Sequence, residues 1–413
     1  MLRPLVPLHP LVVEALFLAI KYYYTLPAYG GILLKICLTI YSSPWSPHAG
    51  GGQLAVHHLA CALQKMGHDV HALYSKSPDE KISAKPPYTV HWTSHFNCAT
   101  LNLDIFSFAR ALKRLMKWER FDIVHGNAEE AFFASTVARK FSAGYLFTSH
   151  ANMIPETGMI RGMLRPISFL KSINNYLLRS AAFNASRVIT FSEFSKKLVL
   201  RGLGKKKGKN VIVVSPGIDP SWFEVIRQRE DSKDLVLWGR MEDQKGIPEL
   251  LRALKEVLGR IPEVRLHLIG EGNMTESYRK QAEDLGVLER VDFHGWMDVE
   301  AIQKFTTKCA IGVFPSRIES FGLSMAEAMG AGLPIIASRV GALPEFIVDG
   351  VTGSLVAPGN VPALYRAILE KLENADKAQA MADAGRDAVH QRFSWDQSAQ
   401  KMTEIYQAVL DEI

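Results

Sequence analysis

The sequence has little of what marks several common protein classes. Its 413 residues include four cysteines, which are widely spaced and form neither a C-x-x-C pair nor a Cys/His cluster. That pattern argues for free thiols in a reducing compartment, and against a disulfide framework or zinc. Charged residues make up 22% of the chain and apolar residues 47%, so no disorder signature is present. The composition is that of an ordinary globular enzyme.

No apolar run is long enough to cross a bilayer. The run at 11–20 is the most apolar near the N-terminus, but it contains Glu14 and stops at Lys21 after ten residues. A membrane-spanning helix needs about 20 residues. No clear small-residue cleavage site precedes Leu34, which argues against a signal peptide. We therefore expect residues 1–33 to be an apolar extension, either lying in a membrane interface or packed on the body of the protein.

Several nucleotide-binding signatures are also missing. The glycine run Gly50-Gly51-Gly52 is followed by no Walker lysine and does not match G-x-G-x-x-G, so dinucleotide and ATP sites are disfavoured. The chain has no D-x-D pair of the kind that often holds a divalent metal with a nucleotide sugar. Glycine at Gly51 and Gly52 would let the backbone approach a phosphate or a sugar. The alternative is a turn that needs positive φ.

Charge is distributed unevenly along the chain. Residues through Ile218 include 26 basic and 11 acidic side chains, a charge of +15, whereas the remainder has 22 basic and 31 acidic, a charge of −9. The basic half favours an anionic partner, and a membrane leaflet attracts each nearby Lys or Arg by about 1 kcal/mol. Nucleic acid is disfavoured because no recognition motif or aromatic platform is evident. Scattered surface lysines remain the alternative.

Apolar runs of strand length alternate with helical patterns, which predicts parallel doubly wound sheets. A chain of this length exceeds a single core, so we expect two such domains with a boundary near 217–232. Ligands bind at the carboxyl ends of parallel strands, which places the site in a cleft between the sheets. The predicted strands are 32–41, 70–74, 122–125, 145–149, 188–191, 211–214, 235–238, 265–269, 291–293, 310–314 and 334–337.

Two glutamates eight positions apart, Glu319 and Glu327, flank the predicted start of a helix. The run 310–315 reads as a buried strand ended by proline, and 323–332 is rich in helix formers. Helix N-termini bind phosphate, so free N–H groups at Leu323 and Ser324 between two carboxylates favour a ligand with a phosphate between hydroxyl-bearing groups. A sugar nucleotide is such a ligand. The alternative is a solvated loop residue and an ordinary helix-face charge.

Five motifs follow one another along the chain. They are Gly50-Gly51-Gly52 with its helix, Thr148-Ser149-His150, Val214 to Asp219, Gly239-Arg240 with Lys245-Gly246, and the pair Glu319 and Glu327, which has the form E-x7-E. They resemble motifs of the retaining glycosyltransferases called glycosyl transferases group 1, a superfamily that includes glycogen synthase and sucrose synthase. The similarity runs from about Leu34 to the end, over about nine-tenths of the chain. It implies a GT-B fold, with an acceptor-binding Rossmann-like domain at 34–218, a sugar-nucleotide-binding one at 219–392, and a last helix at 393–413 crossing back to the first.

The resemblance also implies a role for each matching residue. Arg240, Lys245 and the helix start at Leu323-Ser324 would neutralise the leaving diphosphate, without a metal ion. Glu327 would accept hydrogen bonds from the ribose hydroxyls, and Glu319 would face the sugar hydroxyls around C3 and C4. His150 would contact the sugar near the reacting carbon, and Met297 would help to frame the base. The candidate site is therefore Gly51, Gly52, His150, Arg240, Lys245, Met297, Glu319, Leu323, Ser324 and Glu327.

The expected function is transfer of a hexosyl group from a UDP- or GDP-linked sugar to a glycan or lipid-linked acceptor, by a front-face mechanism and with no cofactor. The expected location is cytoplasmic, in part on the inner face of the membrane. Alternatives on the same scaffold are a sugar-nucleotide epimerase, a phosphorylase with lysine-bound pyridoxal phosphate, or a sugar-nucleotide-binding protein without transferase activity. A two-carboxylate hydrolase is disfavoured because ribose needs one of the two glutamates.

Overall fold

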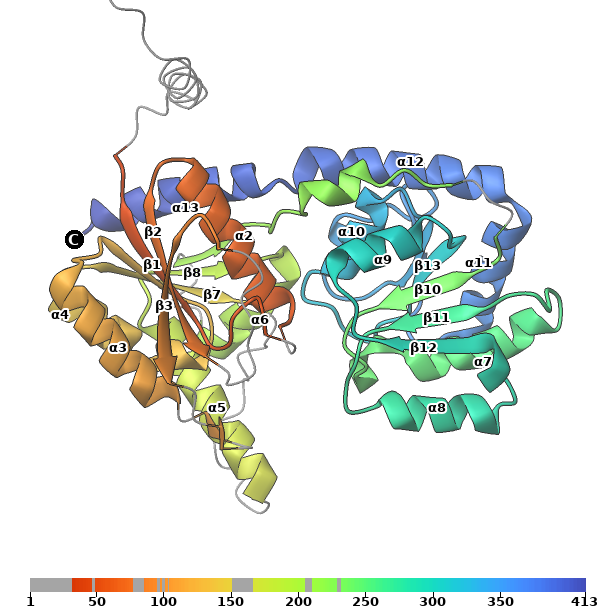
Figure 1. Ribbon diagram of the computed structural model, residues 1–413, viewed down its shortest axis with the longest axis horizontal. Helices are drawn as coiled ribbons and strands as arrows, with labels where there is room; N and C mark the ends of the chain where they lie inside the picture. The colour runs from red at the N-terminus through yellow and green to blue at the C-terminus, as the bar shows by residue number, and fades with distance from the viewer. Residues whose placement is uncertain are drawn as a thin grey trace, which may run out of the picture.

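The computed structural model contains two α/β domains that lie side by side (Figure 1). It describes residues 32–46, 49–76, 85–94, 97–98, 101–102, 104–150, 166–204, 210–228 and 232–413. Each domain is built on a parallel sheet with helices against both faces. Two facing sheets of this kind confirm the predicted fold class.

The first domain holds a seven-stranded sheet in the order β3-β2-β1-β6-β7-β8-β9, and every adjacent pair is parallel. Its central strands, such as β1, β6 and β7, are largely buried, as a sheet covered on both faces requires. The bounds are β1 Lys35–Ile40, β2 Asp69–Lys76, β3 Thr89–Ser94, β6 Ile123–Gly126, β7 Gly144–Ser149, β8 Arg187–Thr190 and β9 Val211–Val213. A separate antiparallel pair joins β4 Asn97–Cys98 to β5 Leu101–Asn102.

The second domain holds a six-stranded sheet in the order β12-β11-β10-β13-β14-β15, again parallel throughout. Its core is one continuous apolar cluster, in which Leu235, Leu250 and Ile336 are fully buried. The bounds are β10 Leu235–Trp238, β11 Leu266–Ile269, β12 Val291–Gly295, β13 Ile311–Phe314, β14 Ile335–Ser338 and β15 Ser354–Val356.

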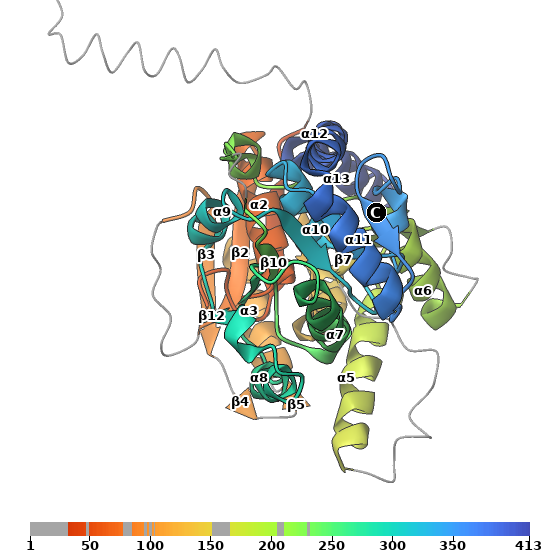
Figure 2. The same cartoon turned by 90° about the vertical axis from the view of Figure 1, so that its right-hand side faces the viewer.

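Helices connect successive strands and cover the sheets (Figures 1 and 2). Those of the first domain are α2 Gly51–Lys65, α3 Asp104–Trp118, α4 Ala134–Lys140, α5 Pro166–Phe183 and α6 Glu193–Leu203. The remaining helices are α7 Ile247–Leu258, α8 Thr275–Asp284, α9 Val299–Thr306, α10 Leu323–Gly330, α11 Val361–Glu373, α12 Ala375–Arg392 and α13 Trp395–Leu410.

Four of the described strands do not follow from the sequence patterns: the edge strands β3 and β15, and the two-residue strands β4 and β5. In β3 the run Thr-Val-His-Trp-Thr-Ser is half polar, because this strand forms the edge of its sheet and no residue of it is fully buried. Strand β15 is the edge of the other sheet and has only three residues. Edge strands are covered less completely than central ones, so they lack the continuous apolar run that reveals a buried strand.

The chain passes between the domains twice, and the two crossings touch. The first follows β9, and the second leads from α12 to α13, the helices drawn in blue along the top of Figure 1. The Ile218 N–H donates to the Phe393 carbonyl oxygen at 3.0 Å, and a methyl group on Gly217 would lie 2.3 Å from the Trp395 backbone nitrogen. The crossings therefore pack backbone against backbone.

Helix α13 ends against the first domain. The His125 ring lies between the Tyr406 hydroxyl, 2.7 Å from Nδ1, and the Thr148 hydroxyl, 2.6 Å from Nε2. Burial lowers the pKa of His125, so its imidazole is neutral. Nearer the helix start, Lys65 pairs with Asp396 at 2.7 Å. The last helix is thus part of the first domain's core.

The predicted apolar extension at residues 1–33 lies almost wholly outside the described residues, and its role stays a prediction. Residues 159–187 mix basic and apolar side chains, a pattern that favours an amphipathic helix, and the structure describes them from Pro166 onward, where they form α5. In the parts of the chain that the structure describes, no helix combines the length and the apolar character needed to cross a membrane.

Candidate active site

The glycine loop at the start of α2 is the point where the predicted segments meet. A methyl group on Gly51 would lie 3.0 Å from Leu323 Cδ1, and one on Gly52 would lie 3.5 Å from His150 Cγ. The Gly50 N–H donates to Gln53 Oε1 at 3.0 Å, which anchors the loop. A side chain on this loop would therefore fill the space between the first domain and the start of α10.

The His150 ring is held in one tautomer by Asn127. The Asn127 side-chain amide donates to the carbonyl oxygens of Thr39 and His125, each at 3.1 Å, so its Oδ1 must accept from His150 Nε2 at 2.8 Å. The lone pair of His150 is then on Nδ1, which is buried and has no hydrogen-bond partner among the described residues. Burial lowers the pKa of His150 to about 4. At neutral pH the Nδ1 atom of this ring is therefore free to accept a hydrogen bond from a ligand.

Lys245 and Glu319 form an ion pair in the second domain, with Nζ and Oε1 2.7 Å apart. The two side chains are only 16% and 12% exposed, and the Ser316 hydroxyl also donates to Glu319 Oε1 at 2.9 Å. Lys245 ends a short 3-10 turn, Asp243–Lys245, and Glu319 lies in the loop between β13 and α10. The pair joins the loops that follow two adjacent strands, β10 and β13.

Glu327 lies one turn into α10, with Oε2 accepting from Trp238 Nε1 at 3.1 Å. Burial, with a smaller contribution from the Asp219 carboxylate, raises the pKa of Glu327 to about 7 although the Trp238 hydrogen bond lowers it. Trp238 is the last residue of β10 and stacks on Trp222 with ring planes 5° apart. One carboxyl oxygen of Glu327 is thus held from the strand side.

The backbone at Gly239 brings the candidate phosphate-binding groups together. Gly239 has φ +142°, and a methyl group there would lie 3.6 Å from Lys245 Cε and 3.9 Å from Ser324 Oγ. Lys245 and the start of α10 therefore flank the same stretch of chain. Arg240 is 64% exposed and pairs with Glu242 at 3.2 Å. A methyl group on Gly50 would lie 4.0 Å from Arg240 Cζ.

The tenth predicted residue, Met297, lies on the loop between β12 and α9, where it packs against the second-domain core. The other nine surround the glycine loop, Gly239 and the start of α10. Asn127 and Ser316 contact predicted site residues but were not predicted. Each follows a predicted strand, 122–125 or 310–314, and the ends of parallel strands were already the expected position of the site. That rule is the signal that could have found them.

A contact between the domains fixes the loop that carries Glu319. The hydroxyls of Ser192 and Ser195, at the start of α6, donate to the Ser320 carbonyl oxygen at 2.7 and 3.0 Å. The Glu345 carboxylate of the second domain accepts from the N–H groups of Glu193 and Phe194 at 3.0 and 2.7 Å. A carboxylate at a helix N-terminus is favourable.

Comparison with known proteins points in one direction. Residues 219–388 match the family described as "Glycosyl transferases group 1", and residues 49–222 match "Glycosyltransferase Family 4". Glycogen synthase of Mycobacterium tuberculosis is 28% identical over 387 residues, which is 87% of this chain and 91% of that protein. Sucrose-phosphate synthase from Thermosynechococcus elongatus has a TM-score of 0.77 at 23% identity, covering 92% of this chain and all of the other. HepE of Anabaena, solved with UDP and glucose, has a TM-score of 0.72 at 19% identity and covers 91% and 100%.

Two parallel-sheet domains that face each other across a shared site define a GT-B protein. Between them the two family matches span residues 49–388. Residues 219–388 form a glycosyl transferases group 1 domain, residues 49–222 form a Glycosyltransferase Family 4 domain, and the chain is a glycosyltransferase.

Proposed function

We propose that the protein transfers a hexosyl group, with retention of anomeric configuration, from a nucleoside-diphosphate sugar to a glycan or lipid-linked acceptor. The observation that carries the proposal is the convergence of the glycine loop, the Lys245–Glu319 pair and the start of α10. A donor lying there would place its diphosphate beside Lys245 and the helix N–H groups, its ribose beside Glu327, and its sugar between Glu319 and His150.

The leaving diphosphate would be stabilised by fixed charges and dipoles. Lys245 and Arg240 supply cations, and the first N–H groups of α10 supply donors. Because Lys245 is mostly buried, its charge is screened less than that of a surface lysine. We propose that these groups act without a metal ion at the diphosphate.

Given retention, the state of a buried acid of the first domain favours a front-face route over a double displacement. Glu130 is 2% exposed, and its Oε1 accepts from the Thr39 hydroxyl at 3.2 Å. The carbonyl oxygen of the same threonine accepts from the Asn127 side chain. Burial raises the pKa of Glu130 to about 8, so it is protonated at neutral pH and is a poor nucleophile. A front-face reaction, in which the leaving phosphate takes the acceptor's proton, needs no such nucleophile.

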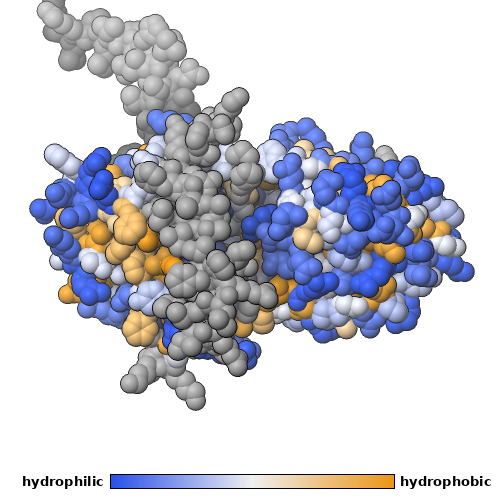
Figure 3. All heavy atoms as spheres, turned by 90° about the horizontal axis from the view of Figure 1, so that it is seen from below, coloured by the Kyte–Doolittle hydropathy of each residue, from blue (hydrophilic) through white to orange (hydrophobic). Residues whose placement is uncertain are grey.

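The acceptor would bind to the first domain, near an anionic surface. Helix α3 exposes Lys113, Arg114 and Lys117 together with Phe106 and Trp118, which are 60% and 82% exposed. Seen from below, orange side chains gather on the described surface of the first domain, while that of the second is mainly blue (Figure 3). Basic and aromatic residues on one helix suit a membrane interface. Sedimentation with anionic and with neutral vesicles tests this placement.

Nucleotide binding is the first test of the proposal. We expect UDP or GDP, but not ADP or CMP, to raise the unfolding temperature of the protein, with and without Mg²⁺. A ligand at 100 times its dissociation constant adds about 2.7 kcal/mol to native-state stability, which is a measurable shift. HepE, whose structure holds UDP, makes UDP the first nucleotide to try. No shift with any nucleotide would contradict the donor site, and a shift only with Mg²⁺ would contradict the metal-free mechanism.

The ribose role of Glu327 predicts a pH dependence. The ionised Glu327 carboxylate would accept hydrogen bonds from both ribose hydroxyls. Because the pKa of Glu327 is raised to about 7, its carboxyl group must lose a proton before it can do so. Lowering the pH from 8 to 6 should therefore weaken UDP binding by about tenfold in the native protein, relative to Glu327→Gln. Calorimetric titration of both proteins measures this. Any titration of UDP itself affects binding to both proteins equally. The same dependence of UDP affinity on pH in the two proteins would therefore exclude the ribose role of Glu327.

A further inference from the structure

A second cluster of ionisable side chains lies in the second domain, away from the glycine loop. His267 is on β11, Asp292 and His294 are on the neighbouring edge strand β12, and His267 is in register with Asp292. The register of the two strands then shifts, so that His294 has no partner and bulges. Bulges re-aim side chains, and here Asp292 and His294 both face His267. Phe305 of α9 packs against both imidazole rings at 4.8 Å.

Two of the three separations between the ligand atoms match a tetrahedral metal ion. His267 Nδ1 lies 3.1 Å from His294 Nε2 and 3.3 Å from Asp292 Oδ2, and all three atoms lie within 4.8 Å of one another. Zinc binds nitrogen and oxygen at about 2.0 to 2.2 Å, so two ligands on a tetrahedral ion are roughly 3.3 Å apart. Both measured separations are close to that edge length.

The proton positions of His267 favour a cation there. Its Nε2 lies 3.4 Å from Asp234 Oδ2 and its Nδ1 lies 3.3 Å from Asp292 Oδ2. A neutral imidazole has one N–H, so in either tautomer one ring nitrogen turns its lone pair toward a carboxylate. A metal ion at Nδ1, with the Nε2–H donating to Asp234, removes the conflict. This carboxylate–histidine–metal order is the usual arrangement around a bound zinc ion.

Asp292 keeps positions free for a metal ion although it pairs with Arg265. Arg265 donates to both oxygens of Asp292 at 2.8 Å. An ionised carboxylate has about four lone-pair positions, so Arg265 leaves one free on each oxygen.

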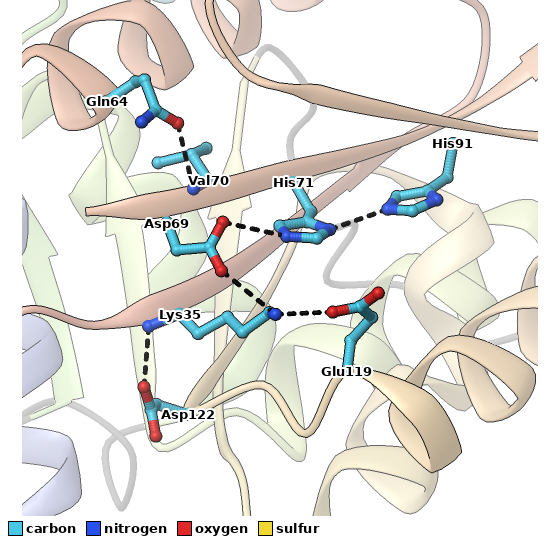
Figure 4. Close-up of polar contacts among 8 residues, drawn as sticks. All are labelled: Lys35, Gln64, Asp69, Val70, His71, His91, Glu119 and Asp122. Carbon is cyan, nitrogen blue, oxygen red and sulfur yellow. Dashed lines mark hydrogen bonds and ion pairs between the residues drawn. The ribbon is translucent and has the colours of Figure 1, made fainter. Parts of the chain in front are cut away.

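The first domain contains a similar pair of histidines without this geometry (Figure 4). His71 Nε2 donates to Asp69 at 3.0 Å, and its Nδ1 lies 2.7 Å from His91 Nε2. There the carboxylates of Asp69 and Glu119 turn toward Lys35, at 3.1 and 2.5 Å. Two neutral histidines satisfy every one of these contacts, and the pair is an ordinary hydrogen bond. It is a built-in control for the cluster on β11 and β12.

We propose that His267, Asp292 and His294 bind one divalent transition-metal ion of the zinc class, with Asp234 orienting His267. The ion would fasten the edge strand β12 to β11. Strand β12 leads directly into the loop that carries Met297, so the ion would steady that loop from its base. The site is separate from the proposed diphosphate site, and the proposal does not depend on the donor or the reaction.

Cobalt binding to the full, untagged chain tests the proposal after dialysis against EDTA. We expect one equivalent of Co²⁺ to give the visible absorption of a low-coordinate Co²⁺ site, and Zn²⁺ to displace it. Asp292→Asn and His294→Ala should each lower Co²⁺ affinity at least tenfold, while His91→Ala should leave it unchanged. Circular dichroism checks that each variant is folded.

Two results would overturn the proposal. One is Co²⁺ binding that both ligand variants retain, which would place the ion elsewhere. The other is the absence of Co²⁺ binding in the unmodified chain.

Discussion

Lys245→Ala is expected to lower kcat for sugar transfer by about 10²- to 10³-fold, the usual effect of removing one preorganised group that stabilises developing charge. Lys245 is 16% exposed and is held 2.7 Å from Glu319. It also flanks Gly239 opposite Ser324. The cation is therefore fixed beside the expected diphosphate before the reaction starts. Steady-state kinetics with a UDP- or GDP-sugar measures the loss.

The matched control is Lys304→Ala. Lys304 also pairs with a glutamate, Glu300, at 2.8 Å, but the two side chains are 75% and 76% exposed on α9. Exposed pairs contribute little, so this variant should keep full activity and stability. Glu319→Gln should lose transfer as Lys245→Ala does, while keeping a side chain that accepts from Ser316. Near-normal turnover by either site variant, with the fold intact, would remove both residues from the reaction.

Gly341→Ala should destabilise the protein by about 3 kcal/mol and lower transfer by about 100-fold in the fraction that stays folded. Gly341 has φ +56°, and a methyl group there would lie 1.8 Å from the Glu319 carbonyl oxygen. The Ala342 N–H donates to the same oxygen at 3.2 Å. A side chain at position 341 must push the Glu319 loop aside, and a 1 Å displacement of a site is enough for that loss.

Gly350→Ala separates the cost of a left-handed alanine from the effect of a clash with the Glu319 carbonyl oxygen. Gly350 has φ +75°, similar to that of Gly341, but no atom lies within 4 Å of the added methyl group. Only the cost of a left-handed alanine remains, about 1 to 2 kcal/mol, and transfer should be unchanged. Thermal unfolding and kcat of the two variants give the comparison. Equal effects in both would mean that backbone conformation, and not the contact with Glu319, explains the loss.

Central strands and the order of the site segments were predictable from the sequence, and their exact contacts were not. The runs at 235–238 and 310–314 are continuously apolar because their strands are buried on both faces, and the structure has β10 and β13 there. The turn before α10 was evident from the change from strand to helix pattern. The half-polar strand β3 and the three-residue strand β15 gave no such signal.

Contacts across long sequence separations explain what the sequence left open. Lys245 and Glu319 were both candidate residues, but nothing in their local patterns indicated that they form an ion pair. The tautomer of His150 depends on Asn127, 23 residues earlier, whose amide is oriented by the carbonyl groups of Thr39 on β1 and His125 on β6. Gly341 belongs to no motif, and its role follows only from the approach of the Glu319 backbone.

The two interdomain segments, which are hydrogen-bonded to each other at Ile218 and Phe393, keep the two halves of the candidate site close together. His150 and the glycine loop belong to one domain, and Lys245, Glu319 and Glu327 to the other. With two tethers joined near one point, each half-site stays at an effective concentration of the order of millimolar or higher around its counterpart. A donor bound on the second domain, as proposed above, would therefore meet the first domain in an intramolecular step. Two half-sites with weak affinities of their own would then combine to bind the complete donor tightly.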